Sequence, residues 1–188
     1  MLKTSLQAFN VLTDDEIENF IQCFSSKNLN KSDFFVKAGE TCNEIACIKS
    51  GLFRSFYITD KGEEVTSCLK FPGSLMTAYS SFITGHGSFV NMQAIVPAEL
   101  LVVQKKVMED LANENPNWMK FLRIIAEQQY IELEKRTFQF QSDSAVQRYT
   151  ALVEQHPEYI QNIPQQYLAS YLGITQRHLS RIRKEQHL

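Results

Sequence analysis

The sequence predicts an α+β fold: an N-terminal antiparallel β-roll of jelly-roll type with flanking helices, then a long helix, then a helix-turn-helix without a full wing. Short apolar runs broken by turn residues from about 29 to 105 predict the roll. An uninterrupted helical pattern predicts the long helix, and the spacing of the last apolar residues predicts two crossing helices. The expected domains are residues 1–115, 116–140 and 141–188.

The first domain begins with a helix and continues as strands. Thr13 can cap a helix in which Glu16 completes a capping box, and apolar residues follow at helical spacing. Regular turns between short strands are typical of a sandwich or barrel, and Asp60-Lys61-Gly62 marks a hairpin because Gly62 can take a positive φ. The expected strands are 33–37, 44–49, 52–58, 64–71, 90–95 and 99–104, with short helices within 74–84 and over 105–113.

The long helix begins after Asn115, a favourable N-cap, with Pro116 in the first helical position. Its apolar residues cover more than one stripe, so it must be covered on two sides. One side faces the roll, and the other faces either a second copy of the helix or the core of a monomer. A polar hinge over 139–144 and a capped helix to about Gln155 follow. The dimer interpretation uses a coiled-coil spacing, and its positions are Phe121, Ile124, Gln128 and Ile131.

The last part of the chain has the pattern of two short helices joined by a tight turn. A helix over 164–172 ends at Gly173, where the chain must turn sharply, and Ile174 fills the angle before the next helix. Small Ala169 allows the two helices to cross closely. These are the physical requirements of a helix-turn-helix. The residues of the second helix that face inward are Leu179 and Ile182.

The outward face of that second helix is basic. An arginine can donate two hydrogen bonds to a guanine edge, a glutamine can pair with adenine, and hydroxyls or a helix N-terminus suit phosphates. Double-stranded DNA is therefore the expected partner, although a solvated basic helix on an ordinary helical hairpin would carry the same residue types. The expected DNA contacts are Thr175, Gln176, Arg177, His178, Ser180, Arg181, Arg183 and Lys184.

The basic charge is local, because the whole chain of 188 residues carries a formal net charge of −2. Residues 176–188 hold four basic side chains against one acidic side chain, so the positive charge gathers at the C-terminal end. No long uncharged apolar stretch predicts a membrane span, and the early acidic residues are unlike a signal peptide. We therefore expect a cytoplasmic protein with no membrane partner.

The sequence contains no pattern typical of catalysis or metal binding. It lacks a nucleophile elbow, a P-loop and an HExxH motif, and His86 is the one histidine of the roll, too few for a cupin-type site. The four cysteines form no closely spaced pair, so we expect reduced thiols; they are Cys23, Cys42, Cys47 and Cys68. We expect no enzyme, no catalytic residues, no metal and no cofactor.

The order of roll, long helix and helix-turn-helix resembles the Crp/Fnr family of bacterial transcription regulators. The motifs that carry the resemblance are Val36-Lys-Ala-Gly-Glu, Ile48-Lys-Ser-Gly-Leu-Phe-Arg, Phe71-Pro-Gly and the helix-turn-helix over 168–182. The resemblance implies a homodimer joined through the long helix, whose paired recognition helices enter successive major grooves of a pseudo-palindromic operator. It also implies that Gln176, Arg177 and Arg181 read the bases.

Three departures from the family pattern concern the effector, a metal cluster and the wing. Cyclic-nucleotide binders of the family carry Gly-Glu and, about ten residues later, Arg-Ser, which hold the ribose and the phosphate. These positions are Thr77-Ala78 and Ser88-Phe89 here, so we expect no cyclic AMP binding of the usual kind. Cys23 alone cannot hold an iron–sulfur cluster, and the chain stops at Leu188, soon after the recognition helix.

Several interpretations stay open. The roll could bind an effector other than cyclic AMP, with some of its aromatic side chains lining a pocket for an apolar or uncharged ligand. It could also bind nothing and only support the dimer. The alternative for the whole chain is a ligand-binding or protein-interaction module whose C-terminal helical hairpin does not bind DNA.

Overall fold

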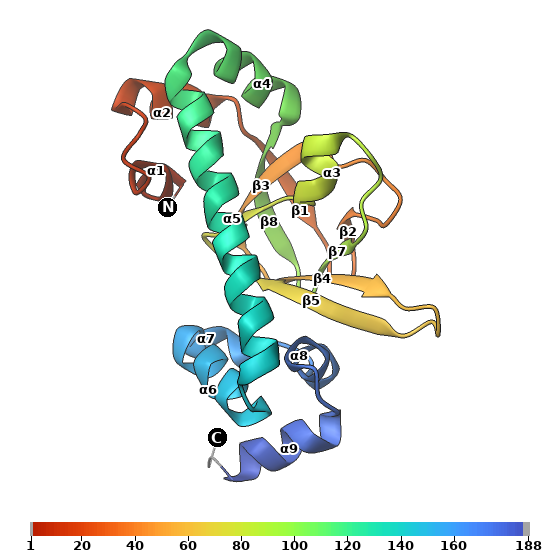
Figure 1. The fold of residues 1–188 in the computed structure, drawn as a ribbon. Coiled ribbons are helices and arrows are strands. Elements are labelled where there is room, and N and C mark those ends of the chain that lie inside the picture. Colours follow the sequence, from red (N-terminus) through yellow and green to blue (C-terminus); the bar gives the residue numbers. More distant parts are fainter. Residues whose placement is uncertain (1, 186–188) are drawn as a thin grey trace.

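The computed structural model describes residues 2–185, in which a β-roll and a helical unit lie along one long helix, α5 (Figure 1). Helices α1, α2 and α4 surround the N-terminal end of α5, and α6–α9 gather at its C-terminal end. The helices are α1 (Leu2–Gln7), α2 (Asp14–Gln22), α3 (Tyr79–Thr84), α4 (Lys105–Glu114), α5 (Pro116–Ser142), α6 (Ala145–Gln155), α7 (Pro157–Ile160), α8 (Gln165–Leu172) and α9 (Gln176–Glu185). The strands are β1 (Ser25–Leu29), β2 (Phe34–Val36), β3 (Glu44–Ser50), β4 (Phe53–Ile58), β5 (Glu64–Lys70), β6 (Leu75–Met76), β7 (Asn91–Ala94) and β8 (Ala98–Gln104).

Two four-stranded antiparallel sheets form the roll. Their strand orders are β1-β8-β3-β6 and β2-β7-β4-β5, so each sheet joins strands that are distant in the sequence. Apolar side chains of both sheets meet between them, with Phe53 of β4 and Leu100 of β8 fully buried. The β4–β5 hairpin turns at Gly62, whose φ is 78°, as the Asp-Lys-Gly signal predicts. The predicted α+β fold with an antiparallel roll is confirmed.

A second apolar cluster joins the N-terminal helices to the start of α5. The predicted capping box of α2 is present: the Thr13 hydroxyl accepts from the Glu16 N–H, and the Glu16 carboxylate accepts from the Thr13 N–H. Helix α2 buries Phe20, whose ring lies 4.7 Å from that of Trp118 in α5. The same cluster contains Phe121, so the first turns of α5 are held inside the chain.

Three elements, α1, α7 and β1, lie outside the predicted helices and strands. Strand β1 is mostly polar and lacks the alternation of a half-buried strand, but it pairs with β8 from Ser25↔Val102 to Leu29↔Ala98. Its conformation therefore comes from backbone hydrogen bonds to a strand distant in the sequence. The segment predicted as one short helix within 74–84 is instead the short strand β6 followed by α3.

The helical unit shares its apolar core with the roll. Leu52, Leu69, Phe71 and Ile95 of the roll pack in one cluster with buried residues of α6–α9. The domain predicted as 141–188, of which residues 186–188 lie outside the described part, is thus packed directly onto the second sheet of the roll. Helix α9 is the last element of the described residues.

The described residues show neither a candidate membrane helix nor a candidate metal site. No helix among residues 2–185 is long and apolar enough to span a bilayer. In the same part of the chain, no group of three or more His, Cys, Asp or Glu side chains is arranged to hold a metal ion. The four cysteines are free thiols.

Candidate nucleic-acid interface

Helices α8 and α9 form the predicted helix-turn-helix. The turn contains Gly173 in the left-handed conformation, with φ 69° and ψ 33°, and its N–H donates to the Ser170 carbonyl. The following Ile174 N–H donates to the Ala169 carbonyl at 3.0 Å, which closes the end of α8 as a glycine-terminated helix requires. Ala169 is 2% exposed, so the close crossing that a small side chain allows is present.

The second helix, α9, is buried on one side and exposed on the other. Leu179 and Ile182 are almost fully buried in the core of the helical unit. The Thr175 hydroxyl accepts a hydrogen bond from the His178 N–H at 3.2 Å, so Thr175 caps α9 as predicted. The predicted contacts that are exposed are Thr175, Gln176, Arg177, His178, Arg181 and Lys184.

Two predicted contacts, Ser180 and Arg183, are partly buried and already have partners within the chain. The Gln165 amide of α8 donates to the Ser180 hydroxyl and to the Gln176 carbonyl, which fixes the crossing of α8 and α9. The Arg183 guanidinium donates to the Tyr149 hydroxyl at 3.3 Å. Both side chains therefore stabilise the packing of α9, in contrast to the exposed arginines.

Two arginines of other helices hold the C-terminal end of α8. Arg136 of α5 donates to the Tyr171 carbonyl at 3.2 Å and lies 4.0 Å from the centre of the Tyr171 ring. Arg148 of α6 donates to the Leu172 carbonyl through two nitrogens, at 3.0 and 3.3 Å. The last carbonyls of a helix have no partner within it and carry partial negative charge, so these cations satisfy and stabilise them. The turn of the motif is thereby attached to both α5 and α6.

The other side of α8 is attached to the β4–β5 hairpin through Arg54, a buried side chain of β4. Its guanidinium lies between the rings of Phe56, at 3.9 Å, and Tyr167 of α8, at 3.7 Å. Two of its nitrogens donate to Gln93 at 3.1 and 2.8 Å, and one pairs with Glu64 at 2.7 Å. The roll and the motif are therefore connected by a desolvated cation as well as by apolar packing.

A hydrogen bond beside Arg54 completes this connection. The Thr66 N–H of β5 donates to the Ser170 hydroxyl of α8 at 2.8 Å. Sequence reasoning missed Arg54, Arg136 and Arg148 as structural contacts. Each partner is distant in the sequence, and the one local signal was an arginine in an otherwise buried strand pattern at Arg54.

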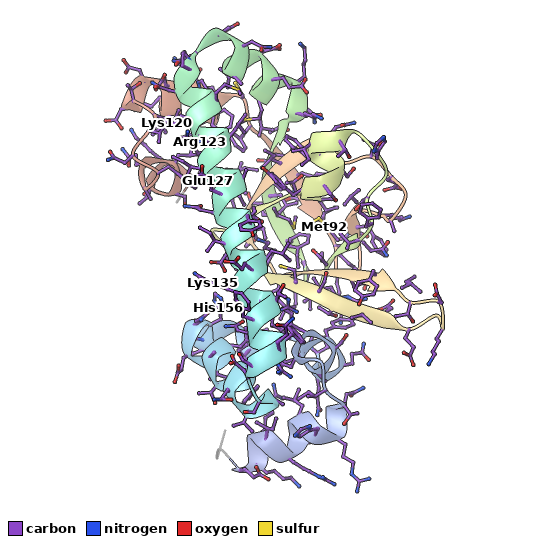
Figure 2. The ribbon with its side chains drawn as sticks, viewed as in Figure 1. Met92, Lys120, Arg123, Glu127, Lys135 and His156 are labelled. Carbon is purple, nitrogen blue, oxygen red and sulfur yellow. The ribbon has the colours of Figure 1, made fainter. Side chains whose placement is uncertain are left out.

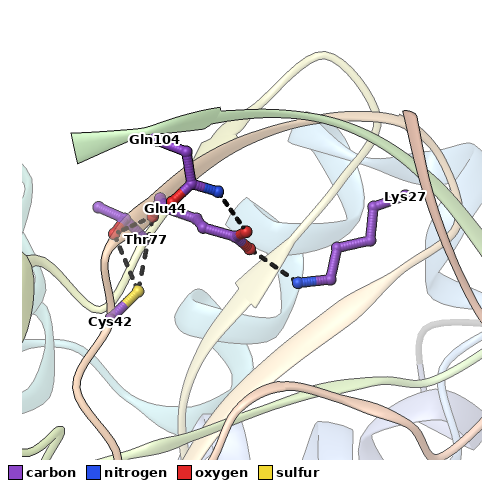
Figure 3. Close-up of polar contacts among 5 residues, drawn as sticks. All are labelled: Lys27, Cys42, Glu44, Thr77 and Gln104. Atoms are coloured by element: carbon purple, nitrogen blue, oxygen red, sulfur yellow. Dashed lines mark hydrogen bonds and ion pairs between the residues drawn. The ribbon is translucent and has the colours of Figure 1, made fainter. Parts of the chain in front are cut away.

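The predicted effector positions occupy the junction between β6, α3 and β7. The Thr77 hydroxyl donates to the Glu44 carbonyl at 2.9 Å and lies 3.4 Å from the Cys42 sulfur (Figure 3). The Glu44 carboxylate accepts from Lys27 and from Gln104, each at 2.7 Å. Burial acts to raise the pKa of Glu44, but these donors, Lys27 above all, hold it below its ordinary value. Thr77 thus ties β6 to β3.

The residues near this junction do not fit a cyclic nucleotide. Ala78 and Ser88 are buried, and the Ser88 hydroxyl donates to the Val90 carbonyl within its own loop. The Ser88 carbonyl accepts a hydrogen bond from the Gly39 N–H, and the Ser88 N–H donates to the Glu40 carbonyl, each at 2.8 Å. The loop that contains Ser88 therefore lies closed against the turn at Gly39. The side chain of Phe89 is 79% exposed to solvent and so does not line the interior of the roll. Among the described residues the buried cation is Arg54, which is held between β4 and α8, so nothing here would neutralise a buried phosphate.

The predicted dimer positions of α5 differ in their exposure. Phe121 is 3% exposed and its ring packs 5.0 Å from that of Phe9, so it belongs to the core of its own chain. Ile124 is partly buried, whereas Gln128 and Ile131 are exposed. The physical reason is that the N-terminal helices already cover the first turns of α5.

The C-terminal half of α5 carries apolar side chains without a cover in this single chain. Ile131 and Phe138 are 45% and 58% exposed, and their separation of seven residues places them on one helix face. Charged residues also follow the helix, as Lys120, Arg123, Glu127 and Lys135 show in Figure 2. Other exposed apolar residues of this half are Tyr130 and Leu133, whereas Phe140 packs against Arg136 and Arg148.

Comparisons with known proteins agree with this architecture. Residues 26–115 match the family described as cyclic nucleotide-binding domain. The chain is 28% identical over 180 residues to the anaerobic regulatory protein of Haemophilus influenzae, which covers 89% of this chain and 68% of that protein. It is 24% identical over 181 residues to the protein of that name from Pasteurella multocida, covering 89% and 64%. The chain therefore spans about two thirds of the length of these relatives.

Solved structures show the same fold. FixK2 from Bradyrhizobium japonicum has a TM-score of 0.77 with 16% identity, covering 87% of this chain and 84% of that one. The catabolite activator protein of Thermus thermophilus has a TM-score of 0.61 with 18% identity, covering 97% and 88%. With its nucleotide-binding-type roll, its long helix and its terminal helix-turn-helix in this order, the chain has the architecture of Crp/Fnr transcription regulators, to which it is similar.

Proposed function

We propose that this protein is a homodimeric regulator that binds double-stranded DNA in a sequence-specific manner through α9. The observation that carries the proposal is the exposed stripe of Arg177, Arg181 and Lys184 opposite the buried Leu179 and Ile182. Arg177 and Arg181 are four residues apart, and Lys184 follows three residues later, so the three cations share one face of the helix. A helix with such a face, fixed against a supporting helix, suits the major groove.

The exposed residues divide by their chemistry into base readers and phosphate contacts. Arg177 and Arg181 can each donate two hydrogen bonds to a guanine, and Gln176 can pair with an adenine. Thr175, His178 and Lys184 suit the phosphate backbone near the start and end of α9. Ser180 and Arg183, which are partly occupied within the chain, contribute by orienting α9, and their contacts to DNA are secondary.

A dimer is needed because one short basic helix on a chain of net charge −2 offers few phosphate contacts. The exposed apolar residues of the C-terminal half of α5, with Ile131 and Phe138 on one face, support a parallel pairing of two such helices. This pairing would place two α9 helices on successive major grooves, about 34 Å apart. The seam begins after Phe121, since that residue is held in the core of its own chain.

The effector of this regulator is not cyclic AMP bound in the usual way. A cyclic phosphate buried in the roll needs a positive partner, and Arg54 is held by Gln93, Glu64 and Tyr167 on the opposite face of the sheet. Titration calorimetry with cyclic AMP and cyclic GMP should give no binding in the micromolar range. Such binding would contradict this part of the proposal.

Selection of bound sequences from a random DNA pool tests DNA binding and half-site spacing together. We expect a pseudo-palindrome whose half-sites lie about one helical turn apart. Against that site, Arg177→Ala should lose about 5- to 150-fold in affinity for each half-site, because a bidentate contact to a guanine is worth about 1–3 kcal/mol and the dimer loses one such contact per subunit. Lys61→Ala, at the exposed tip of the β4–β5 hairpin, is the matched control and should bind like the wild type.

Two outcomes would reject the proposal. One is a pool that yields no enriched sequence at low salt, and the other is undiminished binding of the selected site by Arg177→Ala. Light scattering on the same preparation tests the dimer, since a persistent monomer at micromolar concentration would contradict the pairing of α5.

A further inference from the structure

A partly enclosed apolar chamber lies beside strands β3, β5 and β6 of the roll, where the N-terminal helices, α3 and α5 meet. Its volume is about 170 Å³, and its walls are almost entirely apolar. Phe20 comes from α2, Met76 from β6, Phe82 from α3, and Leu122 and Ile125 from α5. Since close-packed protein interiors rarely leave space for several carbon atoms, the chamber is a candidate ligand site.

A wider and more polar opening of about 410 Å³ adjoins this chamber and shares five lining residues with it. Its own lining includes the polar residues Ser5, Ser74 and Gln128. The two spaces together thus have an apolar inner end and a polar outer end. This shape suits an elongated molecule with one apolar end and one polar end.

Lys70, at the end of β5, lines both spaces and is the one charged residue among the described residues that line them. No acidic side chain lines either space, and within residues 2–185 no ion pair holds the Lys70 ammonium. It is partly buried at the boundary between the apolar and the polar space. A partly desolvated cation without a counterion favours a ligand that brings a negative charge.

We propose that this chamber binds an amphipathic anion: an aliphatic tail of about six to eight carbons in the inner space, with its carboxylate at Lys70. The tail length follows from the volume, because a dry apolar cavity of about 150 Å³ accepts a molecule the size of benzene. Of the four predicted effector positions only Thr77 lines the chamber, whereas Ala78, Ser88 and Phe89 do not, so the chamber lies beside those positions and is not formed by them.

Two further groups define the chemistry of the chamber. Burial raises the pKa of the Tyr79 phenol, so this lining residue stays neutral and adds no competing charge. The Thr77 hydroxyl is already bonded to the Glu44 carbonyl. Lys70 is therefore the group that selects the headgroup, and the apolar walls select the tail.

The site has a direct structural route to the helix-turn-helix. Phe121, Leu122, Ile125 and Gln129 of α5 form one wall of the chamber, and α5 carries Arg136 farther along, which holds α8. A ligand that separates α5 from α3 would shift this attachment. That regulatory consequence rests on the proposed function, whereas ligand binding itself does not.

The fluorescence of Trp118, the one tryptophan of the chain, reports occupancy. Its ring lies 4.7 Å from Phe20 and 5.8 Å from Phe121, both of which line the chamber. Titration of the full chain with octanoate should change this fluorescence saturably. Octan-1-ol should bind about tenfold or more weakly, because it lacks the charge-assisted contact, and octylamine should bind least.

Two substitutions test separately the contact with the carboxylate and the contacts with the aliphatic tail. Lys70→Met should abolish the preference for octanoate over octanol while octanol binding persists, which also shows that the variant is folded. Ile125→Trp should fill the chamber and abolish binding of both ligands, measured by titration calorimetry because this variant has a second tryptophan, with an unchanged circular dichroism spectrum. Lys61→Met, far from the chamber on the hairpin tip, should behave like the wild type.

The proposal is overturned if octanoate does not bind the wild type, or if Lys70→Met retains the preference for octanoate. Unchanged binding by a folded Ile125→Trp variant would overturn it as well. DNA affinity with and without octanoate is a separate measurement. Octanoate binding with no DNA binding would reject the proposed function and leave the ligand site intact.

Discussion

Replacement of Arg54 by alanine should loosen the helical unit from the roll. The guanidinium donates twice to Gln93, pairs with Glu64 and lies between the rings of Phe56 and Tyr167. Hydrogen bonds to a charged group are worth about 1.5–3 kcal/mol, and a desolvated cation–π contact about 2 kcal/mol. Glu64 is half exposed, so its carboxylate regains water and limits the loss.

These contributions overlap, so we expect Arg54→Ala to lower the free energy of unfolding by about 2–4 kcal/mol. For a chain of this length, that loss corresponds to a fall in Tm of roughly 5–15 °C. The control is Lys49→Ala, which removes an exposed ion pair with Glu99. Surface pairs contribute about 0–1 kcal/mol, so the control should lie close to the wild type.

Urea unfolding followed with two probes is the assay. Trp118 fluorescence reports the N-terminal cluster, while far-ultraviolet circular dichroism also reports α6–α9. The two transitions should coincide in the wild type, and in Arg54→Ala the circular dichroism transition should come first, because the helical unit has lost its polar attachment. Arg54→Ala transitions that coincide and stay within about 1 kcal/mol of the Lys49→Ala control would refute the assigned role of Arg54.

Two further predictions concern a backbone position and a titrating group. Gly173→Ala should destabilise the chain by about 1–2 kcal/mol in urea unfolding, because φ is 69° and the new methyl group would lie 2.8 Å from Phe140. Gly173→Asn should lose less stability, because asparagine tolerates this left-handed conformation better than alanine. Glu44→Gln should lower stability at pH 7 and converge with the wild type in acid. The folded pKa of Glu44 lies below its ordinary value near 4.5, so its contribution is present above that value and is lost as the pH falls through the folded pKa. A Glu44→Gln effect that is constant from pH 7 to pH 3 in thermal melts would contradict this assignment.

The sequence by itself determined those parts of the molecule whose physical requirements are local. A left-handed turn needs a glycine, a close crossing needs a small residue and the core side of α9 needs apolar residues at helical spacing, so α8 and α9 were predictable from Gly173, Ala169, Leu179 and Ile182. The β4–β5 hairpin was predictable for the same reason, from its Asp-Lys-Gly turn. The exposed basic stripe followed from the same helical spacing.

The tertiary structure alone decided which residues connect the parts. Strand β1 has no alternating pattern and exists because β8 offers it hydrogen bonds. Phe121 fits a dimer seam by its spacing, yet it is buried because α1 and α2 cover that end of α5. Arg54, Arg136 and Arg148 carry no signal of their partners, which lie in other elements. The chamber beside Lys70 likewise depends on elements from distant parts of the sequence meeting, and no local pattern encodes the space left between packed side chains.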